Sequence, residues 1–67
     1  MTVYINSELK VIPEDISTVG KLVDHLHISR HGTGVGLNNR LIPSSAWDNT
    51  YLKENDRIMI VSATYGG

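Results

Sequence analysis

The 67-residue sequence contains no cysteine. Disulfide bridges, a cysteine-based zinc site and a thiol nucleophile are therefore excluded. No stretch approaches the ~20 consecutive apolar residues that a membrane span needs. The first residues, Met1 to Ile5, have neither the basic start nor the long apolar run of a secretion signal. We therefore expect a cytoplasmic protein that does not enter a membrane.

An excess of charge of one sign is also missing. Six basic and seven acidic residues leave a net charge of −1, and the basic residues are spread along the chain, so no footprint for nucleic acid is visible. His25 and His27 would point to different sides of a helix, His31 lies beyond its expected end, and no carboxylate is placed to complete a ligand set. We expect neither nucleic acid nor a metal as a ligand.

The shortness of the chain limits what it can do. A single domain of this size buries only about 60% of the surface that its unfolded form exposes, which leaves little material for a deep catalytic cleft. Possible acid–base or nucleophilic groups lie in segments where turn and cap roles are more typical, namely at Asp48, Glu54, Asp56, Ser44 and Ser45. These limits favour a binding or carrier protein over an enzyme.

Hydrophobic patterns in the first half predict a hairpin and a helix. Two β-favouring runs, 3–5 and 9–12, flank the turn-forming Asn6-Ser7-Glu8, with a loop of two residues or slightly more. The helix is expected over about 18–28, because one apolar stripe recurs at helical spacing in Val19, Leu22, Val23 and Leu26. Gly32 is the expected stop signal.

The second half predicts strands again. Residues 35–37 and 41–42 form two short apolar strands around an Asn-Asn turn, residues 44–48 a short helical turn, and residues 57–62 the last strand. The glycines of the run 32–36 follow a helix and enter a strand, which is the wrong context for a phosphate loop. The order β-β-α-β-β(short)-β predicts an α+β domain, with one mixed sheet packed on one helix and the first and last strands as parallel neighbours.

The last strand is apolar on both faces. If Ile58 and Ile60 face the helix, Met59 and Val61 point to the open side of the sheet. An apolar patch there would mark a surface on which a partner docks, although scattered exposed apolar residues are also common. Met59 and Val61 are our candidates for that docking face.

The sequence closes with Tyr65-Gly66-Gly67. Terminal glycines add nothing to a folded core, whereas a thin tail without side chains can enter a partner's narrow active site. We therefore expect a β-sheet domain over residues 1–62 and a flexible tail over 63–67. An incidental flexible end is the alternative reading of the same two glycines.

These features together resemble the ThiS-type sulfur carrier proteins of thiamine biosynthesis, relatives of the small molybdopterin-synthase subunit and of ubiquitin. The resemblance covers nearly the whole chain and rests on four segments: Thr18-Val19-x-x-Leu22-Val23, Val35-Gly36-Leu37-Asn38, Leu41-Ile42-Pro43 with Trp47, and Leu52 to Gly67 with its Glu54-Asn55-Asp56 turn and Gly-Gly end. It departs from the family at Ser44, where members often carry arginine, and at Asn6-Ser7, where members often carry Asn-Gly. The resemblance implies a ubiquitin-like β-grasp fold.

The resemblance also implies a function. A ubiquitin-activating-like enzyme would consume ATP to adenylate the Gly67 carboxylate, a sulfur-donating enzyme would convert it to a thiocarboxylate, and thiazole synthase would take the sulfur. Tyr65, Gly66 and Gly67 would thread into the partner, and the chain would bind no cofactor and have no catalytic residue of its own. The alternatives are a molybdopterin-synthase subunit, a ubiquitin-like protein modifier and a plain interaction module.

Overall fold

The computed structural model describes residues 1–62, so the predictions made for Tyr65, Gly66 and Gly67 lie outside the described residues. Its elements follow the predicted order. In chain order they are β1 (Thr2–Ile5), β2 (Glu8–Val11), α1 (Val19–His25), β3 (Thr33–Leu37), β4 (Arg40–Ile42), the 3-10 helix η1 (Ser44–Asn49) and β5 (Arg57–Ser62). No helix within this part of the chain has the length and apolar character needed to cross a membrane.

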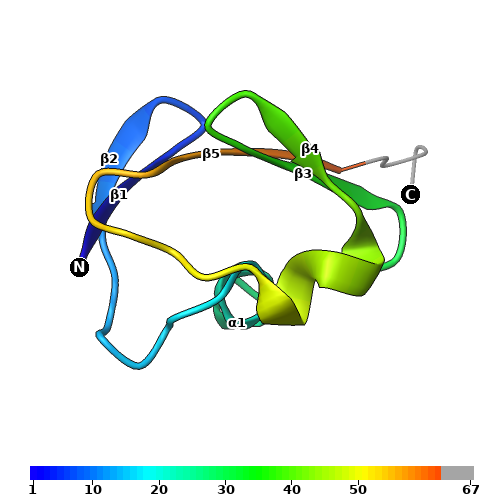
Figure 1. Ribbon diagram of the computed structural model, residues 1–67, viewed down its shortest axis with the longest axis horizontal. Coiled ribbons are helices and arrows are strands. Elements are labelled where there is room, and N and C mark those ends of the chain that lie inside the picture. The colour runs from blue at the N-terminus through cyan, green and yellow to red at the C-terminus, as the bar shows by residue number, and fades with distance from the viewer. Residues whose placement is uncertain (63–67) are drawn as a thin grey trace.

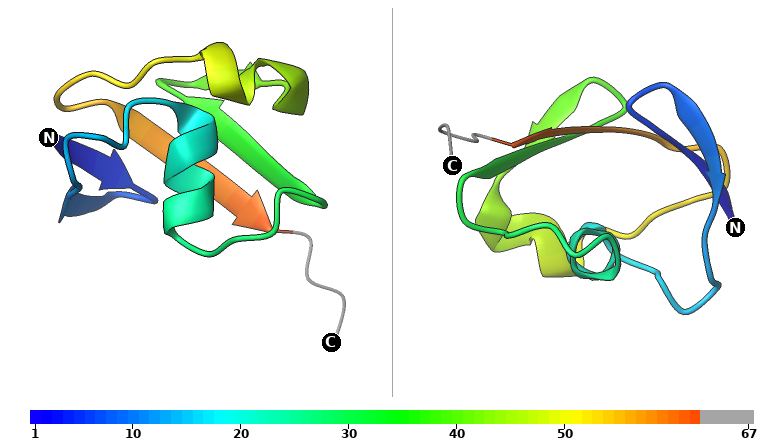
Figure 2. Two further views of the ribbon diagram at one scale, coloured as in Figure 1. Left: turned by 90° about the horizontal axis from the view of Figure 1, so that it is seen from below. Right: turned by 180° about the vertical axis from the view of Figure 1, so that it is seen from behind.

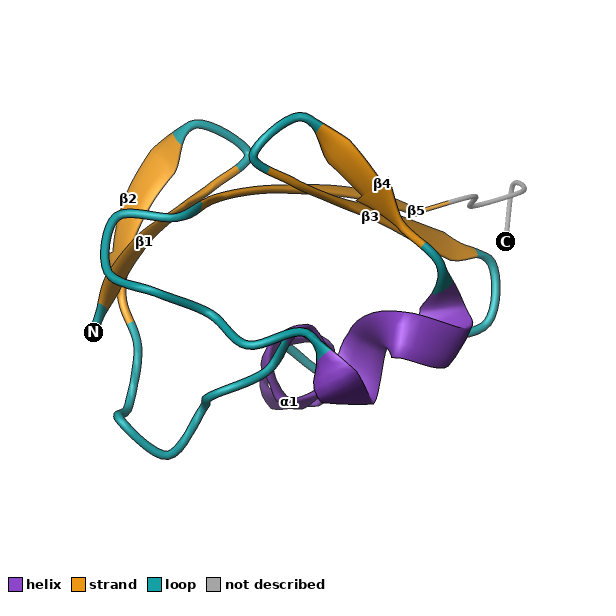
Figure 3. Cartoon of the chain, viewed as in Figure 1, coloured by secondary structure: helices purple, strands orange, loops and turns teal. Residues whose placement is uncertain are grey.

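The five strands form one mixed sheet in the order β2-β1-β5-β3-β4. β1 and β5 run parallel, as the sequence predicted, and the other neighbours are antiparallel. The sheet curves into an arch, with α1 and η1 together on its concave side (Figures 1 and 3). Seen from that side, α1 lies across the central strand β5 (Figure 2, left). The arrangement confirms the predicted α+β class and the ubiquitin-like β-grasp architecture.

Both hairpins close with two-residue turns in the left-handed region. The φ angles are 51° and 72° at Asn6 and Ser7, and 50° and 70° at Asn38 and Asn39. Such turns match the twist of paired strands. The side-chain amide of Asn6 supports the first turn, because its oxygen accepts from the Ile60 N–H at 2.8 Å and its nitrogen donates to the Ile60 carbonyl at 3.2 Å. The first hairpin therefore has the shorter, two-residue loop, although serine tolerates a positive φ less readily than glycine.

The helix is shorter than predicted. It begins after Thr18, whose hydroxyl accepts the Lys21 N–H at 3.1 Å, and it ends at His25. The chain then takes a left-handed turn at His27 (φ 58°), and the Ile28 N–H donates to the Val23 carbonyl at 3.2 Å. This backward bond caps the helix and lets Ile28 pack against the core. The prediction of a helix to residue 28 stopped by Gly32 was therefore wrong.

The core fills the space between the arch and the two helices. Trp47 is 1% exposed, and its indole N–H donates to the Ile42 carbonyl at 2.9 Å, so the ring is buried with its polar atom satisfied. The ten buried apolar residues are Val3, Ile5, Ile12, Val19, Leu22, Val23, Val35, Trp47, Leu52 and Ile58. With both helices on one side, the opposite face of the sheet carries no covering element among residues 1–62.

Candidate functional site

The convex face of the sheet presents apolar side chains to solvent. Along β5, Ile58 is buried, Ile60 is partly buried, and the residues between them, Met59 and Val61, are 55% and 61% exposed. Both therefore point away from the helices, on the face where the sequence expected them. Their role in docking stays a prediction.

Sequence reasoning missed three further apolar residues on this face. The hairpin register places Leu9 opposite Tyr4 and Val11 opposite Thr2. Directly opposed residues share a face, so Leu9 and Val11 lie on the convex side, and Leu41 joins them from β4. We call the set of Leu9, Val11, Leu41, Met59 and Val61 the outer apolar face; each member is 55–80% exposed.

A groove of about 650 Å³ runs through part of this face. Leu41, Met59 and Val61 contribute its apolar side chains, Gly34 and Gly36 of β3 lie between them, and the guanidinium-bearing Arg40 and Arg57 also line it. Gly34 and Gly36 belong to the glycine run 32–36, for which the sequence suggested only a helix stop at Gly32 and the start of a strand.

The central strand leads toward the predicted modification site. Ser62, the last described residue, pairs with Thr33 at the end of β5. The tail residues Tyr65, Gly66 and Gly67 therefore follow the strand that carries Met59 and Val61. Gly67 lies five positions after Ser62 in the sequence.

The carboxylates considered as possible catalysts have structural partners. Asp56 is buried and accepts the Lys53 backbone N–H at 2.7 Å and the Asn38 amide at 3.1 Å, which holds the turn at Asn55 (φ 69°). Glu54 accepts the Thr2 N–H at 3.0 Å. The three histidines are exposed, and residues 1–62 contain no group of three or more histidine, aspartate or glutamate side chains placed to hold a metal ion.

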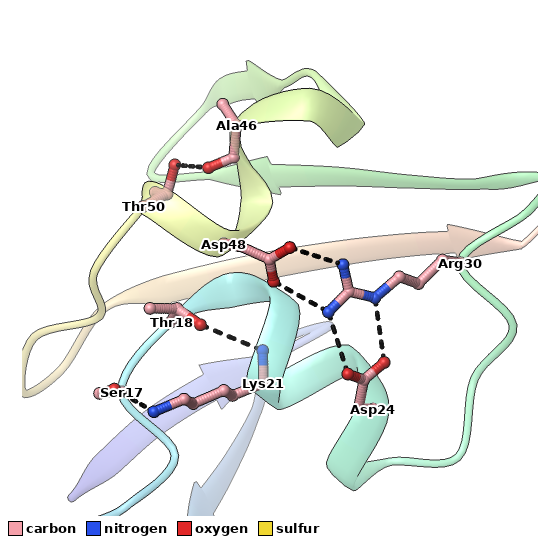
Figure 4. Close-up of polar contacts among 8 residues, drawn as sticks. All are labelled: Ser17, Thr18, Lys21, Asp24, Arg30, Ala46, Asp48 and Thr50. Carbon is pink, nitrogen blue, oxygen red and sulfur yellow. Dashed lines mark hydrogen bonds and ion pairs between the residues drawn. The ribbon is translucent and has the colours of Figure 1, made fainter.

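A cluster of ion pairs on the helix side was not anticipated. Arg30 donates to Asp24 at 2.9 and 3.0 Å and to Asp48 at 2.9 and 3.1 Å, so one guanidinium joins α1 to η1 (Figure 4). Gly20 makes room for it, since a Cβ there would lie 2.1 Å from an Asp48 oxygen and 2.8 Å from Arg30 Nη2. We call Asp24, Arg30 and Asp48 the arginine clamp.

Hydrogen bonds from Arg30 hold the pKa of both Asp24 and Asp48 below the ordinary value of 3.8. A carboxylate with a lowered pKa in the folded state stabilises the fold above its unfolded pKa, and this contribution is lost as the pH falls. All three groups are solvent-exposed, so the effect is modest. The arginine clamp therefore has a structural role, which is to hold α1 against η1.

Replacing Arg30 with glutamine is expected to lower the stability of the protein at neutral pH. The difference from the unsubstituted protein should shrink as the pH falls through 3.8 and further, because the carboxylates then become protonated in both proteins. Urea denaturation between neutral pH and strongly acidic pH measures this. A difference that persists unchanged at the acid end would show that Arg30 acts through packing and not through charge.

Comparison with known proteins agrees with the fold. The ThiS family profile matches residues 3–67. The crystal structure of a thiamine biosynthesis protein (ThiS) from Geobacter metallireducens superposes with a TM-score of 0.83 at 23% identity, covering 100% of both chains. An NMR structure of a thiamine biosynthesis protein from the same organism gives 0.84 at 23% identity, covering 100% of this chain and 88% of that one.

At 23% identity, the two structures show that the chain shares their fold and no more. No curated protein matches the chain significantly. The family profile, by contrast, begins within β1, includes the other six elements and reaches the last residue of the sequence. The chain belongs to the ThiS family.

Proposed function

We propose that this protein carries sulfur for thiamine biosynthesis as a thiocarboxylate on Gly67. The observation that carries the proposal is the ThiS family match over residues 3–67, which includes the terminal Gly-Gly. The ThiS structure from Geobacter metallireducens, described as a thiamine biosynthesis protein, has the same fold over the full length. The family match favours the thiamine branch over the molybdopterin-synthase subunit and the protein modifier.

The chemistry uses the main-chain carboxylate. An unperturbed α-carboxyl group has a pKa of about 3.3–3.7 and is therefore ionised at neutral pH. One carboxylate oxygen attacks the α-phosphorus of ATP and pyrophosphate leaves, which gives an acyl-adenylate. A sulfur nucleophile of sulfide oxidation level, delivered by a sulfur-donating enzyme, then attacks the carbonyl carbon and AMP departs with the oxygen. Thiazole synthase takes up the sulfur from the resulting thiocarboxylate.

The protein's own part in this scheme is presentation. Gly66 and Gly67 have no side chains, so a narrow active site can close around their backbone. Tyr65, which precedes them, is the one residue of the threading segment with a bulky side chain. The adenylating enzyme supplies the ATP site and the catalytic groups. This division of labour makes the chain a substrate of its partners and not an enzyme.

The test is the intact mass of the protein after incubation with ATP, a thiamine-pathway adenylating enzyme and a sulfur source. A gain equal to the replacement of one oxygen by one sulfur is expected. The absence of such a gain, with an enzyme shown to be active on another carrier, would overturn the proposal. Conjugates that survive on a denaturing gel would instead identify a protein modifier.

Charged substitutions at Met59 and Val61 are expected to slow adenylation. Glutamate at either position would place a charge at the centre of an apolar contact. The loss of a single anchor residue in such a contact weakens binding by about tenfold or more. The rate at low carrier concentration measures this. Tyr51→Glu is the matched control, because Tyr51 is 66% exposed but bridges to Thr18 on the helix side. Equal rates for all three variants would exclude this docking face.

A further inference from the structure

Gly34 and Gly36 occupy strand positions that do not require glycine. Neither has the positive φ that is found at Gly32. A Cβ on Gly36 would meet the Arg40 carbonyl at 3.6 Å and the Met59 Cβ at 3.8 Å, and one on Gly34 would meet only the Val61 carbonyl at 3.9 Å. These are ordinary contact distances. Because glycine weakens a strand, the two residues need another explanation.

Their position in the sheet supplies one. Val35 between them is 1% exposed and points into the core, so Gly34 and Gly36 face the convex side. The register puts Gly36 between Leu41 of β4 and Met59 of β5, and Gly34 beside Val61. The missing side chains thus form the floor of the groove, and exposed apolar side chains form its walls.

The charged residues of the groove have a single sign. Arg40 and Arg57 line it, and no acidic residue does so among the residues that the structure describes. Neither arginine belongs to the ion pairs found in residues 1–62. Arg57 instead lies over the Tyr4 ring, 5.4 Å from its centroid. Guanidinium groups held beside an apolar hollow complement a partner's carboxylates.

We propose that this groove receives one apolar side chain of a partner protein, flanked in the partner by acidic residues that pair with Arg40 and Arg57. The inference rests on the proposed function, which makes the adenylating enzyme the partner. A second copy of this chain is a poorer occupant, because a two-fold contact through this face would bring the arginines of both copies together. Gly34 and Gly36 are then specificity-determining positions, since their lack of a side chain admits the anchor.

Two substitutions separate the two parts of the groove. Gly36→Val fills the floor with a β-favouring side chain at a position where the backbone tolerates it, so the melting temperature should stay the same or rise while binding falls. Arg40→Glu combined with Arg57→Glu reverses the charge and leaves the floor open. Lys21→Glu is the charge control, because Lys21 is exposed on α1 at the opposite side of the sheet.

The measurement is the dissociation constant of the full chain with a purified thiamine-pathway adenylating enzyme, at low and at high salt. Each groove variant should bind about tenfold more weakly or worse at low salt, and Lys21→Glu should bind like the unsubstituted protein. Added salt should weaken binding of the unsubstituted protein and have less effect on the doubly reversed variant. Melting temperatures show whether each variant is folded.

The outcomes distinguish this inference from the proposed function. Sulfur uptake by the unsubstituted protein, together with unchanged binding of both groove variants, would overturn the groove and leave the carrier function standing. Loss of binding in both variants, with no sulfur uptake by the unsubstituted protein, would support the groove and overturn the carrier function. No binding by the unsubstituted protein, or self-association that Gly36→Val abolishes, would overturn the groove assignment.

Discussion

Deletion of Gly67 is expected to reduce thiocarboxylate formation below detection. The variant still ends in a glycine carboxylate, that of Gly66, so the reacting group is chemically unchanged. Its reach is shorter by one residue, about 3.3–3.6 Å. A misplacement of about 1 Å already slows positioned reactions by about a hundredfold. The deletion therefore tests whether the position of the carboxylate matters, and intact mass after the sulfur-transfer reaction measures it.

The fold should not respond to this deletion. The core is built from residues 3–58, and the last strand ends at Ser62. The melting temperature of the deletion variant should therefore equal that of the full chain, and Thr64→Ala serves as a second tail variant that keeps the chain length. Sulfur uptake by the deletion variant at the normal rate would contradict the assignment of Gly67 as the acceptor.

Replacement of Trp47 with alanine is expected to destabilise the protein by about 3–5 kcal/mol. The indole is 1% exposed, and its removal opens a cavity between η1 and the sheet and leaves the Ile42 carbonyl without its donor. Because a small domain has a total stability of only about 5–15 kcal/mol, much of the variant should be unfolded at mild denaturant concentrations. Urea denaturation followed by circular dichroism measures the loss.

Tyr51→Ala is the control for Trp47→Ala. It removes an aromatic ring that is 66% exposed, and surface substitutions of this kind change stability by no more than about 0.5 kcal/mol. Similar losses for the two variants would show that the Trp47 ring contributes little to the core.

The parts of the fold that local pattern determines were predicted well. The bounds of β5 were predicted at 57 and 62, because an apolar run follows a turn in which Asn55 takes the left-handed conformation. The helix was predicted too long because Leu26 continues the apolar spacing and no stop signal was recognised before Gly32, although the left-handed turn at His27 ends the helix and brings Ile28 to the core. A tertiary contact ended the helix before its local signal did.

The candidate site depends on features that need the register. The two-residue turn at Asn6-Ser7 sets Leu9 opposite Tyr4, and a shift by one residue would have sent Leu9 to the core. The sequence left the loop length open, so it did not show on which face Leu9 and Val11 lie. The arginine clamp is harder still to foresee, since Arg30 and Asp48 are 18 positions apart and meet only because Gly20 lacks a side chain.

The central place of β5 in the sheet has a consequence for folding. This strand is the last to leave the ribosome, yet it is hydrogen-bonded to both β1 and β3. Until it is synthesised, the two halves of the sheet have no common partner, and its pairing with β1 closes a long loop, which slows folding. The sheet is therefore completed only after β5 has been synthesised. The segment that completes the sheet precedes the residues proposed to carry sulfur, so the completion of the sheet and the synthesis of the proposed acceptor fall at the same stage of translation.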